Sequence, residues 1–256
     1  MFREFITFLK DVKRFFMDIQ AYFTFNIFYK KNIKKESNKN LSEGVTVVIT
    51  SCGRPKHLEE MLISFQMFNT YDISKVILVE DAGCYESKKI AESIIPKDML
   101  HIIFHEKNIG QMTSIDEAYA EVKTEYIFHI EEDWLFIDYS FIETSLEIIN
   151  LDSSIGYVCL RPLQDYSMFK FEDSECKNFK LFKKRNLIWN GIFLNPGIYR
   201  TNNYIAIGKY ENLKKERNLI QAYNHLGLRG ALSNNTNGFV IHNGEGSSTR
   251  LKYKVG

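Results

Sequence analysis

Short apolar runs alternate with helical patterns through the first half of the chain. Runs rich in β-branched and aromatic residues, the composition of buried strands, cover residues 45–50, 76–79, 101–104 and 126–130. Between the runs, apolar residues recur at steps of three and four, which predicts helices over residues 58–68, 87–95 and 112–122. Such alternation is typical of an α/β fold with a mostly parallel sheet and helices on both of its faces.

The second half of the sequence is less regular. It predicts a helix over residues 141–149, a strand over 155–160, and a helix over 213–226 that ends at Gly227, a residue suited to a helix C-terminus. A short strand at 239–241 precedes His242. Residues 189–199 mix aromatic residues with Asn, Gly and Pro, which is typical of loops that line a pocket.

Three acidic residues, Glu131, Glu132 and Asp133, directly follow the apolar run at 126–130. A buried strand cannot hold three adjacent carboxylates without partners, so we expect them at the carboxyl end of the strand, where open α/β sheets bind ligands. Carboxylates at such a position can hold a hard divalent cation, and that cation can hold a diphosphate. A solvated acidic turn is the alternative interpretation of this stretch.

Polar residues also follow the two preceding strands of the predicted sheet. Ser51 and Arg54 come after the first run, and Glu80 and Asp81 come after the second. Right-handed crossovers bring the carboxyl ends of parallel strands to one edge, so these side chains should meet the three acids there. Two simpler roles stay open: Arg54 could form an ion pair with Glu80 or Asp81, and Glu80 could cap the following helix.

Composition limits the possible partners and compartments. The 256 residues are 45% hydrophobic and 25% charged, which suits one globular domain with an appendage. The net charge of +1 gives no overall field that would favour nucleic acid. Four widely spaced cysteines and the lack of a recognisable signal peptide favour free thiols in the cytoplasm, with the inner face of a membrane as a possible location; the cysteines are Cys52, Cys84, Cys159 and Cys176.

The N-terminal segment differs from the remainder in charge and pattern. Residues 1–40 hold nine Lys/Arg and four Asp/Glu, a net of +5, and apolar residues within 1–29 recur at helical spacing. We divide the chain into an amphipathic helix with a linker, residues 1–43, and a main domain, residues 44–256. Residues 1–35 could contact a membrane surface, the domain's own core or a second copy in an oligomer. No window of about 18 uninterrupted apolar residues exists, so a spanning helix is not expected.

Several segments in this order resemble glycosyltransferase family 2, whose members have the GT-A fold. VVITSCGRP and VILVEDAG resemble the first two strands of the family with their loops, and NIGQMTSIDEAY resembles its Asn-x-Gly turn and helix. FHIEEDW falls where the family has its Asp-x-Asp metal motif, and KERNLIQAYNHLGLR resembles a later acidic segment that ends in Gly-x-Arg. VIHNGEGSST resembles the segment whose His can complete the metal site. The resemblance covers about residues 44–245.

The resemblance implies metal-dependent, inverting transfer of a sugar from a nucleotide-diphosphate sugar to a hydroxyl of a carbohydrate acceptor, as in the synthesis of surface polysaccharides or glycans. Asp133 would bind Mn²⁺ or Mg²⁺ with His242, and Glu216 would be the catalytic base that deprotonates the acceptor. The donor would contact residues from four segments of the chain, namely Ser51, Arg54, Glu80, Asp81, Asn108, Gly110, Asp116, Glu131 and Glu132. Glu replaces the family's usual Asp at positions 80, 131 and 216, and Lys215 stands where an acid is usual.

Three aromatic residues, Trp134, Trp189 and Tyr199, could stack on acceptor sugar rings, although core packing is the commoner role of aromatic side chains.

Two other functions fit the same sequence pattern less well. A sugar-phosphate nucleotidyltransferase also uses a doubly wound sheet and a metal, but it normally opens with a Gly-rich loop, whereas the first turn here has one Gly. A carbohydrate-binding protein without catalytic activity would explain the Glu substitutions.

Overall fold

The structure is a computed structural model that describes residues 2–34, 40–167, 169–173, 179–183 and 191–244. The chain begins with a long helix, α1 (Phe2–Thr24), which runs into a π-helical turn, η1 (Phe25–Tyr29), and a 3-10 turn, η2 (Lys30–Asn32). The predicted N-terminal helix is therefore present. The division of the chain at residue 43 stays a prediction.

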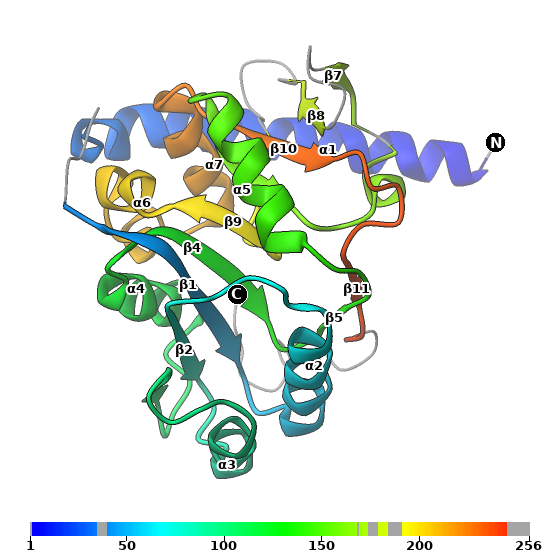
Figure 1. Ribbon diagram of the computed structural model, residues 1–256. Coiled ribbons are helices and arrows are strands. Elements are labelled where there is room, and N and C mark those ends of the chain that lie inside the picture. The colour runs from blue at the N-terminus through cyan, green and yellow to red at the C-terminus, as the bar shows by residue number, and fades with distance from the viewer. Residues whose placement is uncertain (1, 35–39, 168, 174–178, 184–190, 245–256) are drawn as a thin grey trace.

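Four parallel strands form the first half of a nine-stranded sheet, in the order β3-β2-β1-β4 (Figure 1). They are the strands expected from the four apolar runs, and their bounds are β1 (Ser42–Ser51), β2 (Lys75–Glu80), β3 (Leu100–Phe104) and β4 (Thr124–Glu131). Their register brings Ser51 beside Glu80 and Thr50 beside Glu131, so the polar ends of three strands lie at one edge of the sheet.

The second half of the sheet continues in the order β9-β6-β10-β8-β7, with β9 and β8 running against the parallel strands beside them. The bounds are β6 (Ile155–Cys159), β7 (Phe171–Asp173), β8 (Phe179–Phe182), β9 (Gly197–Arg200) and β10 (Arg229–Ser233). The expectation of loops throughout residues 189–199 is wrong at its end, because β9 inserts between β4 and β6. A separate two-stranded sheet pairs β5 (Trp134–Phe136) with β11 (Val240–His242).

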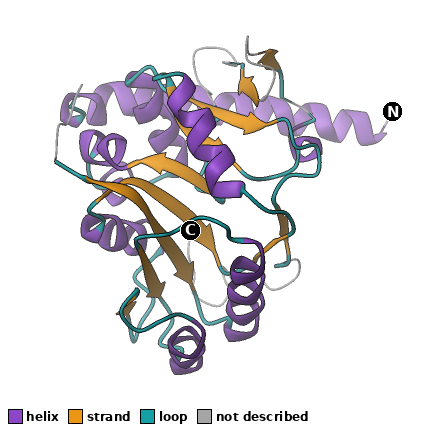
Figure 2. Cartoon of the chain, in the orientation of Figure 1, coloured by secondary structure: helices purple, strands orange, loops and turns teal. Residues whose placement is uncertain are grey.

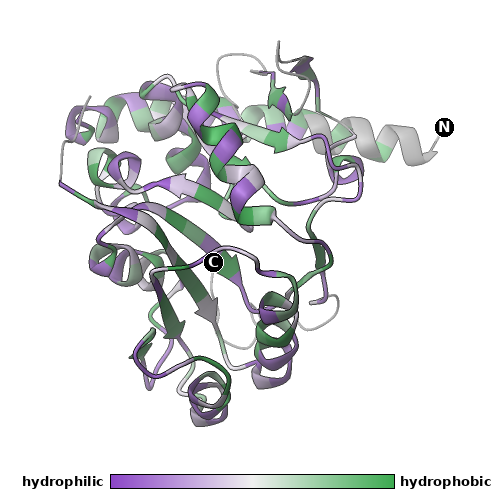
Figure 3. Cartoon of the chain, in the orientation of Figure 1, coloured by the Kyte–Doolittle hydropathy of each residue, from purple (hydrophilic) through white to green (hydrophobic). Residues whose placement is uncertain are grey.

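Helices cover both faces of the large sheet, as predicted (Figure 2). One apolar core joins the sheet to α2 (Pro55–Phe68), α3 (Tyr85–Ile94) and α5 (Phe141–Leu151). The other joins it to α4 (Gln111–Glu121), α6 (Thr201–Ile207), η4 (Tyr210–Leu213) and α7 (Glu216–His225). Neighbouring residues of the central strands therefore belong to opposite cores, and Figure 3 shows much of these strands in the colour of hydrophobic residues.

Two turn residues support the helix ends that the sequence suggests. Pro55 occupies the start of α2, where its missing N–H is not needed. Gly227 follows α7 with φ +76°, a left-handed conformation that glycine adopts at low cost, so the predicted C-terminal glycine of this helix is confirmed. The remaining short element, the 3-10 turn η3 (Leu163–Tyr166), comes after β6 on the side of the polar strand ends.

His129 on β4 is a fully buried histidine whose two ring nitrogens have no hydrogen-bond partner among the described residues. Its ring lies edge-on to Tyr119, with the centroids 5.8 Å apart. Burial lowers the pKa of His129 to about 4, because the charged imidazolium is poorly solvated there.

The burial of His129 should make the folded protein less stable in mild acid. Between its unfolded pKa of about 6.5 and the folded value of about 4, the unfolded chain binds the extra proton, so the stability present above pH 6.5 falls as the pH drops through this window. We expect His129→Leu to remove up to about 3 kcal/mol of this pH dependence. Urea unfolding at pH 7.5, 6 and 5 measures the free energy of unfolding of each variant, with the exposed His101→Gln as the matched control. If this free energy changes with pH in the same way in wild type and His129→Leu, the buried His129 is not the source of the acid sensitivity.

Candidate active site

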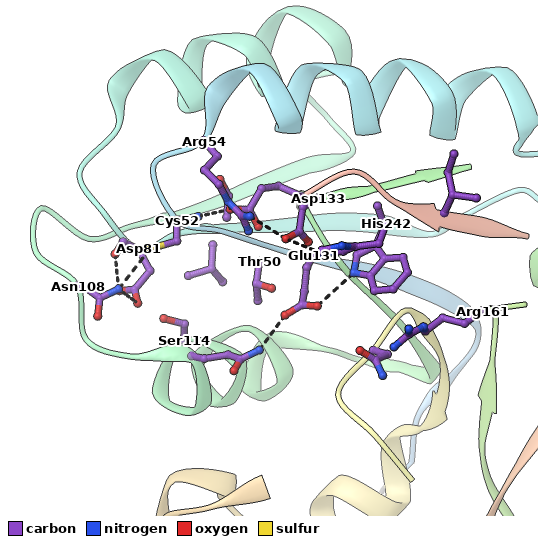
Figure 4. A pocket seen from close by; sticks show the side chains of 18 of the residues that line it. Thr50, Cys52, Arg54, Asp81, Asn108, Ser114, Glu131, Asp133, Arg161 and His242 are labelled. Atoms are coloured by element: carbon purple, nitrogen blue, oxygen red, sulfur yellow. Dashed lines mark hydrogen bonds and ion pairs between the residues drawn. The ribbon is translucent and has the colours of Figure 1, made fainter. Parts of the chain in front are cut away.

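A cavity of about 650 Å³ lies at the edge where the carboxyl ends of β1, β2 and β4 meet (Figure 4). Its walls come from these strand ends, from the start of α4, from the loop after β6 and from β11. Of the acids predicted to gather at the sheet edge, Asp81, Glu131, Glu132 and Asp133 line this cavity, together with Ser51, Arg54 and Asn108. The sheet register explains the clustering, because parallel strands in register deliver their terminal residues to one place.

Arg54 is held by two of the three adjacent acids. Its Nε lies 2.8 Å from Glu132 Oε1, and its Nη1 lies 2.7 Å from Asp133 Oδ2. Glu132 also accepts the backbone N–H of Cys52 at 2.8 Å, which ties the loop after β1 to the end of β4. The sequence left open that Arg54 forms an ion pair with Glu80 or Asp81. Arg54 does form ion pairs, but its partners are Glu132 and Asp133.

Glu131 lines the cavity and accepts hydrogen bonds from two side chains. Gln111 Nε2 donates to Oε1 at 2.8 Å, and Trp134 Nε1 donates to Oε2 at 3.3 Å. Burial raises the pKa of the Glu131 carboxyl to about 8, and the charges of Asp133 and Glu132 add to the shift. The Arg54 guanidinium pairs with two of the three carboxylates, so the cluster carries an excess of negative charge when all three are ionised.

His242 reaches the acidic cluster through the small sheet. The β5–β11 pairing sets His242 opposite Trp134, with their rings 4.9 Å apart, and His242 Nε2 lies 3.3 Å from Asp133 Oδ2. Gly244 packs closely against the same carboxylate, since a Cβ on Gly244 would lie 2.5 Å from Asp133 Oδ2. The structure therefore brings together the two predicted metal ligands, which are 109 residues apart in the sequence.

Asp81 organises the turn at residues 108–110. Its carboxylate accepts the backbone N–H groups of Ile109 at 2.8 Å and Gly110 at 3.0 Å, and the side-chain amide of Asn108 at 2.8 Å. His105 Nδ1 lies 3.3 Å from the same carboxylate. Asp81 and Asn108 line the cavity, whereas Gly110 supplies the φ of +99° that the turn requires.

Glu80 is fully buried, which differs from the expected contact with a nucleobase or ribose. Ser51 Oγ donates to its Oε2 at 2.8 Å, and the backbone N–H groups of Gly53 and Ala82 donate to its Oε1 at 3.1 and 3.0 Å. Both oxygens are thus used inside the protein, so Glu80 joins the β1 and β2 loops and has no free face toward a donor in this conformation.

Two other predicted contact residues also lie away from the cavity. Asp116 is buried on α4 and accepts the backbone N–H groups of Tyr210 and Glu211, both at 2.8 Å, so it caps η4 instead of contacting a donor. Tyr199 is 1% exposed and stacks on Tyr157 at 4.7 Å, so no sugar ring can stack on it in this conformation. Trp189 lies outside the described residues.

Glu216 is the first residue of α7 and lies behind one wall of the main cavity. Its Oε1 accepts the backbone N–H of Leu194 at 3.2 Å, and it lines a smaller cavity of about 210 Å³ with Arg14 and Phe193. Asn195, the next residue after Leu194, lines the main cavity. The segment 193–195 therefore lies between the predicted base and the acidic cluster.

The loop after β6 adds to the cavity Arg161, which sequence reasoning missed, and Asp165, which the sequence had offered with Glu211 only as an alternative base. Arg161 lies over the Trp134 ring, 5.0 Å from its centroid, and its Nη2 is 2.8 Å from Asp165 Oδ2. Both residues line the main cavity. A signal was present, because Arg161 follows the predicted strand at 155–160 just as the acids follow the run at 126–130.

The family model for glycosyl transferase family 2 matches residues 46–204, well over half of the chain. The chain belongs to this family. The sequence resemblance is thereby confirmed, and the matched region contains β1, β2, β4 and the acidic cluster at their ends. No curated protein was found to be similar in sequence.

Solved structures show that this family 2 chain has the GT-A-like fold. It resembles TarS residues 1–349 of S. aureus, at 13% identity and TM-score 0.55, over 83% of this chain and 63% of that one. The same protein in complex with UDP-GlcNAc has 12% identity and a TM-score of 0.55, and the match covers 80% of this chain and 61% of that one. The mannosyltransferase PcManGT of Pyrobaculum calidifontis, in complex with GDP-Man and Mn²⁺, has 15% identity and a TM-score of 0.57. That match covers 89% of this chain and 65% of that one. The chain thus spans less than two thirds of each of these proteins.

The acidic cluster of this family 2 chain suits a divalent cation that the protein holds through few ligands. Within the described ranges, no three His, Cys, Asp or Glu side chains are grouped to hold a metal by themselves. Mg²⁺ commonly binds through one or two carboxylates together with substrate phosphates and waters, so Asp133 and His242 are the side chains here that could hold such an ion. A cation there would face the carboxyl groups of the cluster, and an imidazole ligand would favour Mn²⁺ over Mg²⁺.

Proposed function

We propose that the protein transfers a sugar from a nucleotide-diphosphate sugar to a hydroxyl of a carbohydrate acceptor, with inversion at the anomeric carbon, in the synthesis of a surface polysaccharide or glycan. The observation that carries the proposal is the acidic cluster at the strand ends of a family 2 chain, open to a cavity large enough for such a donor. The complexes of TarS with UDP-GlcNAc and of PcManGT with GDP-Man and Mn²⁺ support this donor class.

Asp133 and His242 would hold Mn²⁺ or Mg²⁺, which neutralises the charge that develops on the leaving diphosphate. Arg54 would be released in part from Asp133 and would remain beside Glu132, close to the diphosphate. Arg161, the other cationic side chain of the cavity among the described residues, would contact the diphosphate or an anionic group of the acceptor. Asn108, Glu131 and Glu132 would contact the donor from the remaining walls.

Glu216 would accept the proton of the acceptor hydroxyl as its oxygen attacks the anomeric carbon. The new C–O bond forms while the bond to the diphosphate oxygen breaks, and the nucleoside diphosphate leaves with the electron pair. One displacement inverts the configuration at that carbon. Glu216 requires a shift of the 193–195 segment to reach the main cavity, whereas Asp165 already lines it, so Asp165 is the second candidate for the base.

A thermal-shift panel tests the donor assignment. Ligand that binds only the folded state raises Tm by mass action, by an amount set by its concentration relative to Kd. We expect one class of nucleotide sugar, among UDP, GDP and dTDP derivatives, to raise Tm, with a larger rise when Mn²⁺ is present. An unchanged Tm with every donor at millimolar concentration would contradict the proposal.

A further inference from the structure

The N-terminal helix carries a stripe of exposed apolar side chains that Lys13 and Gln20 interrupt. Ile6, Leu9, Phe16, Phe23 and Ile27 recur at steps of three, four or seven residues and are 37%, 49%, 63%, 59% and 66% exposed. Residues at these steps share one face of a helix. Large apolar side chains grouped on one exposed face commonly mark an interaction surface.

The opposite face of the same helix is the one that packs against the protein. Ala21 and Phe25 are buried, the Phe25 ring lies 6.1 Å from the His225 ring, and Asp18 forms an ion pair with Arg217 of α7. The exposed stripe is therefore not the face that attaches the helix to the body. Figure 1 shows the N-terminal end of α1 extending beyond the remainder of the chain.

The exposed charges on the part of the stripe within residues 12–34 have one sign. Every exposed charged side chain in the described stretch 12–34 is basic, and these side chains are Lys13, Arg14, Lys30, Lys31 and Lys34. The acid of this stretch, Asp18, is half-buried and engaged by Arg217. An apolar stripe bordered by basic residues is complementary to a surface that is apolar beneath and anionic at its boundary.

We propose that α1 and η1 lie in the plane of an anionic lipid bilayer, with the stripe in the acyl boundary and the lysines among anionic headgroups. None of the described helices is long and apolar enough to cross a bilayer, which fits a helix that lies on the surface. A second copy of the chain is a poorer occupant, because two such faces would bring together the basic side chains of residues 12–34, where the one acid, Asp18, is already paired with Arg217. The contact is separate from the transfer reaction and does not depend on the proposed donor or base.

Vesicle sedimentation with the full chain tests the proposal. We expect the protein to pellet with phosphatidylcholine vesicles that contain about 30% phosphatidylglycerol, and to stay in solution with pure phosphatidylcholine, since each basic residue near the surface strengthens binding about fivefold. Lys30→Gln with Lys31→Gln should weaken binding about 30-fold. Phe16→Ser with Phe23→Ser should weaken it about 100-fold, because two aromatic side chains no longer enter the boundary.

The matched control removes similar side chains from another face. Ile63 and Met67 on α2 are 50% and 62% exposed, so Ile63→Ser with Met67→Ser should bind vesicles as wild type does. Equal pelleting with neutral vesicles, no pelleting at all, or no effect of the Phe16 and Phe23 changes would overturn the proposal. So would a wild-type dimer in sedimentation velocity that the Phe16 and Phe23 changes convert to a monomer without any vesicle binding.

Discussion

Asp133→Asn should lower kcat at least about 10³-fold while the protein remains folded. The carboxylate lies between the Arg54 guanidinium and the His242 imidazole, so the change removes the charged oxygen on which the proposed cation site depends. A bound cation contributes several kcal/mol to the stabilisation of developing charge, which corresponds to a loss of this size. Release of nucleoside diphosphate from the donor identified by thermal shift measures the effect.

Two further measurements separate a lost cation site from a damaged fold. Circular dichroism should be unchanged in Asp133→Asn, and Mn²⁺ affinity, read by electron paramagnetic resonance in the presence of nucleoside diphosphate, should fall at least tenfold. The exposed Asp98→Asn is the matched control and should behave as wild type in both measurements. Wild-type activity in Asp133→Asn, or full activity of the unmodified protein in excess EDTA, would contradict the assignment of Asp133.

Glu216→Gln should lower kcat by about 10²–10⁴-fold with little change in donor affinity, the range expected when general-base catalysis is lost. The amide keeps the size of the side chain and can still accept the Leu194 N–H, but it cannot take a proton at neutral pH. Steady-state kinetics with saturating donor and varied acceptor measures kcat and KM separately.

The comparison with Asp165→Asn decides between the two candidate bases. Asp165 lines the main cavity and is paired with Arg161, so its loss should raise KM for a ligand that contacts this loop and leave most of kcat. If the large loss of kcat appears in Asp165→Asn and Glu216→Gln keeps the wild-type rate, Asp165 is the base. A product with the same anomeric configuration as the donor would contradict single displacement by either residue.

Periodicity and strand ends were enough to predict the parallel half of the sheet and the position of its acidic cluster. The four apolar runs form β1 to β4, and right-handed crossovers necessarily bring Ser51, Glu80 and Glu131 to one edge. The same pattern cannot say which acid of a cluster faces the cavity. Glu80 differs from Glu131 because the backbone of two turns donates to Glu80, and such contacts depend on loop geometry that periodicity does not encode.

The second half of the fold was harder to predict because its strands are short and antiparallel pairings lie between distant segments. Gly197–Arg200 is four residues long and preceded by Asn195 and Pro196, so its composition resembles a loop although it pairs with β4 and β6. Tyr199 is buried for the same reason, because that strand is in the middle of the sheet. The resemblance to the family's segment ending in Gly-x-Arg identified Glu216 as the base, but the predicted helix over 213–226 begins only at Glu216, and the sequence does not show that residues 193–195 lie in front of it.

The most direct test of sugar transfer is ³¹P and ¹H NMR of reactions that contain the protein, the selected nucleotide sugar, Mn²⁺ and a panel of carbohydrate acceptors, recorded after the paramagnetic ion has been removed. Glycosyl transfer should produce nucleoside diphosphate, in an amount equal to that of a new glycoside with inverted anomeric configuration, and Asp133→Asn should produce neither. Formation of nucleoside triphosphate and sugar phosphate when pyrophosphate is added would instead identify a nucleotidyltransferase. A donor that binds and is never consumed, with any acceptor, would contradict catalysis and leave a carbohydrate-binding or nucleotide-sugar-binding protein.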